Sequence, residues 1–145
     1  MKVAKEFRWE GAHRLPWHEG LCRNLHGHSY RMLVELSGPP DAHGMVADFQ
    51  EIKAWARPLV SEWDHATLVA ESDRELLSVV REHGWRHVVL PYDTTAENLC
   101  RFAATWLLDR SRDRLSEIGV TRIRVRILET GSSYAEFDLA VGTGE

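Results

Sequence analysis

Two histidines, His26 and His28, are separated by a single glycine in the segment Leu-Cys-Arg-Asn-Leu-His-Gly-His. In an extended chain, residues i and i+2 point to the same face, so both imidazoles can approach one point. A third histidine, His13, follows a segment whose alternating apolar residues indicate a strand. Three histidines without a fourth ligand fixed by spacing are typical of catalytic zinc sites, where water or substrate takes the open position. The sequence therefore predicts a metal site, against the simpler interpretation that these are polar residues at strand ends.

Cys22 lies four residues before His26, in a long loop over residues 14–25. A nearby cation favours the thiolate form of cysteine, which can act as a base or a nucleophile. The alternatives are that Cys22 is a fourth ligand of a closed structural site, or a loop thiol without a role. We favour the reactive thiolate, because three histidines already form a catalytic ligand set.

Three further residues carry titratable groups in informative places. Asp64 and His65 are adjacent. They can form a proton relay if the chain turns there, with His65 as general acid or base. Otherwise they are a helix C-terminus with a favourable histidine. Glu129 ends a predicted strand on its apolar parity, where a buried carboxylate is costly unless it is paired. It could accept two hydrogen bonds from the edge of a guanine or pterin ring, or it could simply reach solvent.

The composition limits the class of protein. A chain of 145 residues, 43% hydrophobic and 28% charged, suits one domain with a core, which we expect to span residues 1–145. The formal net charge of −4 predicts no general affinity for nucleic acid or anionic membranes. No apolar run approaches the roughly 20 residues of a membrane span. Two cysteines are too few for a disulfide framework, and the N-terminus is a charged strand and not a signal peptide. We therefore expect a cytoplasmic protein.

The order of predicted elements indicates the fold class. Alternating apolar residues predict strands at residues 2–9, 28–37, 120–129 and 134–141. Between the two strand pairs, Asp48, Ser72 and Thr94 are predicted N-caps of helices, each with a glutamate three residues later. This order, ββααββ, predicts an α+β fold with a four-stranded antiparallel sheet and helices on one face. The other face is rich in Arg and Glu, and we expect it to meet other subunits.

These features together resemble the 6-pyruvoyl-tetrahydropterin synthase superfamily. The matching segments are residues 11–15, 22–28, 45–49, 64–68, 95–98 and 128–130, in the family's order and across nearly the whole chain. The short spacing from Cys22 to His26 is similar to the bacterial branch, the 6-carboxy-5,6,7,8-tetrahydropterin synthases of queuosine precursor synthesis. The animal biopterin enzymes have a longer insertion there. One departure is Val69, where the family commonly has Asn.

The resemblance implies a tunnelling fold, in which strand pairs from several subunits close a barrel. It implies a homohexamer of two stacked trimers, with active sites at subunit interfaces. The implied site residues are His13, His26 and His28 as zinc ligands, Cys22 as the proton-transferring base, Asp64 with His65 as the relay on a neighbouring subunit, and Glu129, Thr95 and Glu97 as pterin-binding residues. Helix capping alone would also explain Thr95 and Glu97, without a ligand.

The implied activity is a zinc-dependent lyase that converts 7,8-dihydroneopterin triphosphate to 6-carboxytetrahydropterin, acetaldehyde and triphosphate. Arg14 and Arg23 flank the metal ligands and are candidates for binding the phosphates. Two alternatives keep the same site: formation of pyruvoyl-tetrahydropterin, and side-chain cleavage of dihydroneopterin. Two others are not enzymes: a zinc module in which Cys22 is a structural ligand, and a protein that only binds a pterin.

Overall fold

The computed structural model describes residues 1–142. The strands are β1 (Lys2–His13), β2 (His26–Ser37), β3 (Ala66–Ala70), β4 (His87–Leu90), β5 (Arg122–Leu128) and β6 (Tyr134–Ala140). The helices are α1 (Phe49–Trp63), α2 (Arg74–Glu82) and α3 (Ala96–Glu117), and a short 3-10 helix, Leu21–Arg23, lies in the loop after β1. In the described part of the chain, no helix is long and apolar enough to cross a membrane.

The strands form one mixed sheet in the order β4-β3-β1-β2-β5-β6. Strands β1, β2, β5 and β6 are antiparallel neighbours, as predicted, whereas β3 runs parallel to both β1 and β4. The sheet has six strands within residues 1–142, so the prediction of a four-stranded antiparallel sheet is wrong for the sheet as a whole. The order ββααββ also leaves out α2, although the start of this helix was among the three predicted N-caps. Strand β3 is an apolar run directly after a helix, and periodicity cannot distinguish such a run from the end of that helix.

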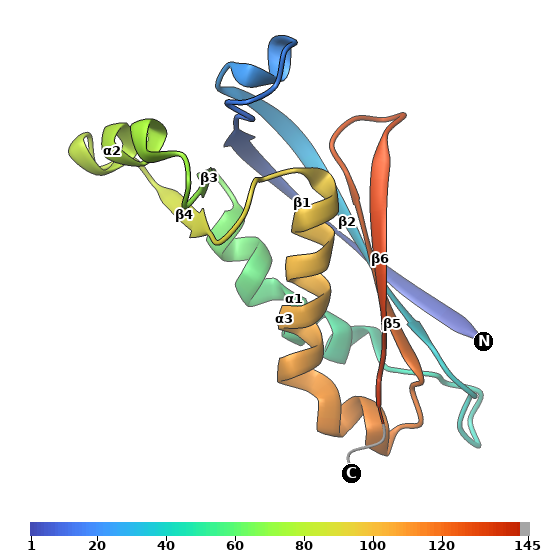
Figure 1. Cartoon of the computed structure of the whole chain (residues 1–145). Helices are drawn as coiled ribbons and strands as arrows, with labels where there is room; N and C mark the ends of the chain where they lie inside the picture. The colour runs from blue at the N-terminus through green and yellow to red at the C-terminus, as the bar shows by residue number, and fades with distance from the viewer. Residues whose placement is uncertain (143–145) are drawn as a thin grey trace.

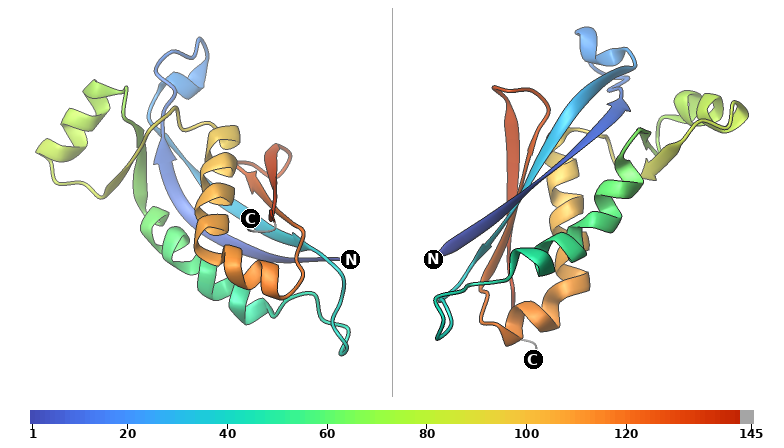
Figure 2. Two further views of the ribbon diagram at one scale, coloured as in Figure 1. Left: turned by 60° about the horizontal axis from the view of Figure 1, so that its bottom comes forward. Right: turned by 180° about the vertical axis from the view of Figure 1, so that it is seen from behind.

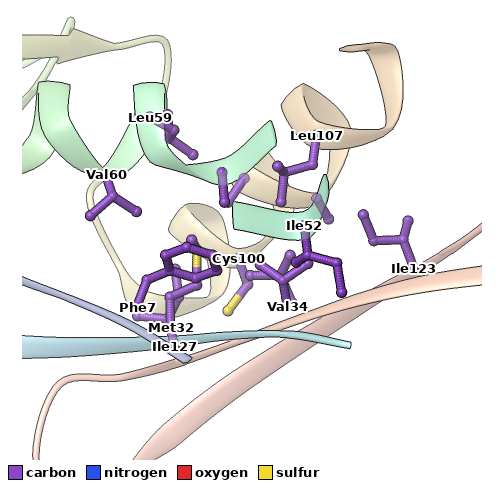
Figure 3. Packing of buried hydrophobic residues seen from close by; sticks show 14 of the residues in the cluster. Phe7, Met32, Val34, Ile52, Leu59, Val60, Cys100, Leu107, Ile123 and Ile127 are labelled. Atoms are coloured by element: carbon purple, nitrogen blue, oxygen red, sulfur yellow. The ribbon is translucent and has the colours of Figure 1, made fainter. Parts of the chain in front are cut away.

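Helices α1 and α3 cover one face of the four long strands, while α2 with β3 and β4 projects to the side (Figures 1 and 2). Alternate residues of each strand point into the layer between the helices and the sheet. Figure 3 shows this core, which includes Phe7, Met32, Val34 and Ile127 from the strands and Ile52, Leu59 and Leu107 from the helices. Cys100 of α3 lies in the same layer, where its thiol donates to the carbonyl oxygen of Ala135 at 3.1 Å.

The opposite face of the sheet is charged, as the sequence predicts. Ion pairs connect neighbouring strands, including Lys2 to Glu35 at 3.0 Å, Arg31 to Glu6 at 2.7 Å, Arg124 to Asp138 at 2.8 Å and Arg126 to Glu136 at 2.8 Å. Exposed pairs of this kind contribute little to stability individually. They keep this face polar, and no helix within residues 1–142 covers it. That the face meets other subunits stays a prediction.

The helix starts agree with the sequence for α1 and differ by one residue for α2 and α3. Asp48 caps α1, accepting from the backbone N–H of Gln50 at 2.8 Å. The caps of α2 and α3 are Asp73 and Thr95, not the residues before them. Both starts hold two adjacent residues that can cap a helix, so local sequence could not choose between them. Thr94, the predicted cap of α3, is instead fully buried.

Arg14, at the end of β1, ties α2 to the sheet. Its Nε and Nη2 atoms donate to the two carboxylate oxygens of Asp73 at 2.7 and 2.6 Å. Asp73 also accepts from the backbone N–H of Leu76 at 3.2 Å. The arginine is the main reason that the pKa of this carboxyl is lowered, and burial opposes it. The side chain of Asp73 is thus both the cap of α2 and its tether.

Replacing Asp73 with alanine is expected to lower the free energy of unfolding by about 2 kcal/mol, because a cap and a bidentate arginine partner are lost together. Glu75→Ala is the matched control. Glu75 also binds Arg14, at 3.0 Å, but its side chain is 82% exposed, so its loss should cost less than about 0.5 kcal/mol. Urea unfolding of the two variants measures the difference. Equal effects would show that the tether adds nothing to stability.

Candidate metal centre and active site

His13, His26 and His28 come together at one end of the β1–β2 hairpin. The antiparallel register places His13 opposite His26, and Gly11 opposite His28, so the three imidazoles share the face that the helices cover. Their possible ligand atoms all lie within 4.8 Å of one another. The structure therefore confirms that the three predicted ligands form one cluster, which could hold a metal ion.

The hydrogen bonds of the histidines leave the atoms needed for metal binding available. The Nδ1 atom of His13 lies 2.8 Å from the carbonyl oxygen of Thr94, and that of His26 lies 2.7 Å from the carbonyl oxygen of Asn24. A carbonyl can only accept, so each Nδ1 carries the hydrogen and each Nε2 presents a lone pair. The Nε2 atoms of all three histidines are buried without a hydrogen-bond partner in the described chain. Buried nitrogens without partners are costly, and a zinc ion would satisfy them.

Thr94 is a residue of the site that the sequence did not indicate. It is fully buried, and both its carbonyl and its hydroxyl oxygen, at 2.8 and 3.2 Å, lie near Nδ1 of His13. A partner of this kind fixes the orientation and the tautomer of a ligating histidine. The contact joins residues 81 positions apart, so no local pattern could have revealed it. In the sequence, Thr94 was indistinguishable from a helix cap.

Burial lowers the pKa of His13 from 6.5 to about 4, and repulsion from His26 and His28 adds to this, while the hydrogen bond to Thr94 opposes it. The pKa of His28 is also lowered, mainly by burial and then by His26. Both residues are therefore neutral imidazoles at neutral pH. Neutral imidazole is the form that binds a metal, so burial prepares the cluster for binding.

The lowered pKa of His13 predicts that acid destabilises the metal-free protein. Between pH 4 and 6.5 the unfolded chain binds the proton of this residue and the folded chain does not, so the free energy of unfolding should fall as pH decreases through this window. The contribution of His13 is on the order of 3 kcal/mol. Urea unfolding at several pH values, in the presence of a chelator, measures it. His13→Asn keeps a donor toward Thr94 and should flatten the dependence; an unchanged slope would contradict the assignment to His13.

Glu129 follows the end of β5 and faces the cluster. One of its carboxylate oxygens lies 3.7 Å from Nε2 of His13, and its side chain is 26% exposed. Burial raises its pKa, and the charge of Glu97 raises it further. The structure thus brings Glu129 and Glu97 into one electrostatic environment beside the histidines. Glu97 is in the first turn of α3. Thr95 caps this helix by accepting from the backbone N–H of Asn98 at 3.3 Å, and its role in pterin binding stays a prediction.

Tyr30 also borders the cluster. Its ring centroid lies 5.3 Å from that of His28, and its ring stacks on Trp9 at 4.9 Å. The phenolic oxygen is buried and has no hydrogen-bond partner in the described chain. Burial, with a smaller effect of the charge of Glu129, raises the pKa of this phenol far above its usual value. It therefore remains a neutral hydrogen-bonding group that a ligand of the site could use.

Cys22 lies in the loop that extends beyond the ends of β1 and β2 (Figure 1). Its backbone carbonyl accepts from the N–H of Leu15 at 2.8 Å, which closes the loop on itself. The thiol is half-buried and does not belong to the cluster of candidate ligand atoms. This geometry favours an open site with three histidines over a closed site with four ligands. The role of the thiol as a base stays a prediction.

The two arginines suggested for phosphate binding differ in the structure. The guanidinium of Arg14 is already bound to Asp73 and Glu75. Arg23 is exposed and has no ion pair within residues 1–142. Of the two, only Arg23 has a guanidinium that is available to an anionic ligand.

Asp64 and His65 are joined by a turn, as their predicted pairing requires. The Nδ1 atom of His65 lies 2.9 Å from a carboxylate oxygen of Asp64. However, His65 lines a pocket of about 400 Å³ together with Glu10, Ser29 and Thr67. These residues have the strand parity opposite to that of the histidine cluster, so they lie on the charged face of the sheet. His28 of the cluster also borders this pocket. Within one chain, the predicted relay and the predicted metal site therefore adjoin the same part of the sheet, with the relay on the charged face and the cluster on the face that the helices cover.

Comparison with known proteins agrees with this architecture. A profile described as 6-pyruvoyl tetrahydropterin synthase matches residues 2–140. The chain is 31% identical over 144 residues to the 6-carboxy-5,6,7,8-tetrahydropterin synthase of Haemophilus influenzae, covering 94% of this chain and 97% of that protein. It is 34% identical over 133 residues to a putative 6-carboxy-5,6,7,8-tetrahydropterin synthase of Pyrococcus abyssi, covering 86% and 80%. The crystal structure of 6-pyruvoyl tetrahydropterin synthase from Plasmodium vivax has a similar fold, with a TM-score of 0.80 at 18% identity over 97% of this chain and 98% of that one. The chain therefore belongs to the 6-pyruvoyl tetrahydropterin synthase family.

Proposed function

We propose that the protein is a zinc-dependent lyase that converts 7,8-dihydroneopterin triphosphate to 6-carboxy-5,6,7,8-tetrahydropterin, acetaldehyde and triphosphate. The observation that carries the proposal is the cluster of three buried Nε2 atoms that have no hydrogen-bond partner among the described residues, with Glu129 beside it. The choice of product rests on the similarity, at about 30% identity, to proteins named 6-carboxy-5,6,7,8-tetrahydropterin synthase.

The chain's own residues have distinct roles in this proposal. His13, His26 and His28 hold zinc, which when bound supplies a Lewis acid that polarises oxygen atoms of the substrate. Glu129 binds the N–H groups of the pterin ring. Burial and the charge of Glu97 raise the pKa of Glu129, and hydrogen bonds donated by a pterin would compensate for that unfavourable environment.

Proton transfer is assigned to Cys22 and to the pair of Asp64 and His65. Cys22 in the loop beside the cluster removes or returns a proton on the substrate side chain. His65 is the second acid or base, and Asp64, at 2.9 Å, orients its imidazole. Thr95 and Glu97, at the start of α3, assist in binding the pterin.

The position of the relay supports a site shared between copies of the chain. Because His65 and the metal cluster lie on opposite faces of the sheet in one chain, we infer that a second copy supplies the relay if both act on one substrate. The four long strands also leave two edges for pairing. Strand β6 is at the end of the sheet, and β1 is paired with β3 only at Gly11 and Ala12. Unpaired edges of this kind are templates for strand pairing between subunits. We propose a homo-oligomer, a hexamer of two trimers, with active sites at its interfaces.

Product analysis tests the activity. Zinc-loaded protein is incubated with 7,8-dihydroneopterin triphosphate, and the products are identified by mass spectrometry. We expect carboxytetrahydropterin, acetaldehyde and triphosphate. A pyruvoyl product would keep the metal site and assign the protein to the other branch of the family, and cleavage of dihydroneopterin would indicate a third outcome at the same site. A folded, zinc-loaded sample without turnover would refute the proposed activity.

A further inference from the structure

His65 has an unusual backbone conformation. Its φ angle is 57°, and it is the one residue other than glycine with a positive φ in residues 1–142. The left-handed region is unfavourable for an L-residue that has a Cβ. Such a conformation persists only where surrounding contacts determine it, and it often marks functional sites. The contacts around this turn therefore decide where the His65 imidazole points.

On one side, the turn is bound to Glu10 of β1. The backbone N–H of His65 donates to the carbonyl oxygen of Glu10 at 2.7 Å. The backbone N–H of Glu10 donates to a carboxylate oxygen of Asp64 at 3.0 Å, and this interaction is the main reason that the pKa of Asp64 is lowered. The Asp64 carboxylate is therefore charged and fixed in place, and it holds Nδ1 of His65.

On the other side, the turn is bound by Arg86, which directly precedes β4. The Nε atom of Arg86 donates to the carbonyl oxygen of Asp64 at 3.0 Å. Its Nη2 atom donates to the carbonyl oxygens of Ser61 at 2.7 Å and Glu62 at 3.2 Å. These are carbonyls at the end of α1, which lack partners within the helix. Helix α1 has no basic residue of its own in its last turn, so Arg86 supplies the favourable charge there.

The backbone of Arg86 is itself held in place. Its carbonyl oxygen accepts from the N–H of Thr67 at 3.0 Å, and the next residue, His87, is paired with Thr67 in the parallel β3–β4 ladder. A planar guanidinium on a fixed backbone presents its N–H groups in a defined geometry. Arg86 does not line the pocket that His65 borders, and its side-chain hydrogen bonds go to the turn and to the end of α1.

We propose that Arg86 is a positioning residue for the proton relay: by holding the carbonyls of Asp64 and of the last turn of α1, it sets the direction of the His65 imidazole. The inference rests on the proposed function insofar as His65 transfers protons. Its structural half, that Arg86 keeps the His65 turn closed, stands independently of the reaction.

Arg86→Ala tests the proposal in the full-length, zinc-loaded protein. We expect kcat to fall by about 10- to 100-fold, the loss typical of a misplaced catalytic group, with KM and zinc affinity unchanged. Added guanidinium ion should restore part of kcat in this variant. Arg86→Lys, which can donate to fewer carbonyls at once, should fall between wild type and Arg86→Ala, and it provides a second variant if the alanine variant does not fold. Arg57→Ala is the control, since Arg57 is exposed on α1, the helix whose end Arg86 binds, and has no ion pair within residues 1–142.

A second readout separates this inference from the proposed function. Hydrogen exchange of the backbone amides of Asp64 and His65 should become faster in Arg86→Ala and remain unchanged in Arg57→Ala. If wild type does not turn over, the proposed function fails, and the exchange rates alone test whether Arg86 holds the turn. If wild type turns over and Arg86→Ala keeps its kcat, or if the exchange rates do not change, the positioning role is refuted.

Discussion

Replacing His28 with glutamine is expected to weaken zinc binding by more than about 100-fold and to reduce turnover to background. Loss of a partner outside the ligand shell typically costs 10- to 100-fold in metal affinity, so loss of a ligand should cost more. The remaining Nε2 atoms, those of His13 and His26, cannot complete a three-ligand site. Competition with a chromophoric chelator gives the zinc affinity, and metal analysis gives the stoichiometry.

His43→Gln is the matched control for this experiment. His43 is exposed in the turn before α1. It borders a pocket together with Val3, and Val3 lies at the end of the β1–β2 hairpin opposite to the histidine cluster. Zinc affinity and turnover should remain at the wild-type level in this variant. If instead His28→Gln bound zinc as tightly as wild type, the three histidines would not be the metal site. The proposed lyase would then lose the observation on which it depends.

Replacing Cys22 with alanine is expected to lower kcat by about 100- to 10,000-fold, the range for loss of a general acid or base. Zinc content and the free energy of unfolding should change little, because the thiol is outside the cluster of ligand atoms and only half-buried. Steady-state kinetics, metal analysis and urea unfolding of the same preparation measure these three quantities.

Cys100→Ala is the matched control, for which we expect lower stability and an unchanged kcat. Cys100 is fully buried in the core, so its replacement should lower stability through lost packing while the folded enzyme keeps its kcat. If Cys22→Ala lost zinc together with stability, Cys22 would be a structural ligand, and the non-catalytic zinc module would be the better description. If it kept full kcat, the base would have to be another residue.

Several features of the site could be predicted from short-range patterns. Strand alternation determines which side chains share a face, and this was enough to group His26 with His28 and to carry His13 to the same face. The same rule placed Glu129 on the apolar side of its strand; in the structure this residue follows β5, and its half-buried carboxylate faces the cluster. Asp64 and His65 are adjacent in the sequence, so a turn at this point was enough to bring the carboxylate to the imidazole, and the structure has that turn.

The parts that the sequence missed depend on contacts between distant segments. Strand β3 was hidden because its burial between two parallel neighbours removes the alternation that identifies a strand. Thr94 and Thr95 are equally good caps by residue type. The tertiary structure distinguishes them, because Nδ1 of His13 donates a hydrogen bond to the carbonyl oxygen of Thr94. Arg14 was a candidate for phosphate binding until α2 placed Asp73 beside it.

The reactive groups, and the face of its own strand on which each one lies, follow from the sequence, because alternation is a property of neighbouring residues. Which faces meet depends on the packing of distant segments. The histidine cluster lies under the helices, whereas His65, attached to the same strand through Glu10, lies on the open charged face. Arg86 reaches the relay from a segment more than twenty residues away. The pairing order of the strands and the packing of the helices determine these relationships, and both arise from long-range burial and hydrogen bonding.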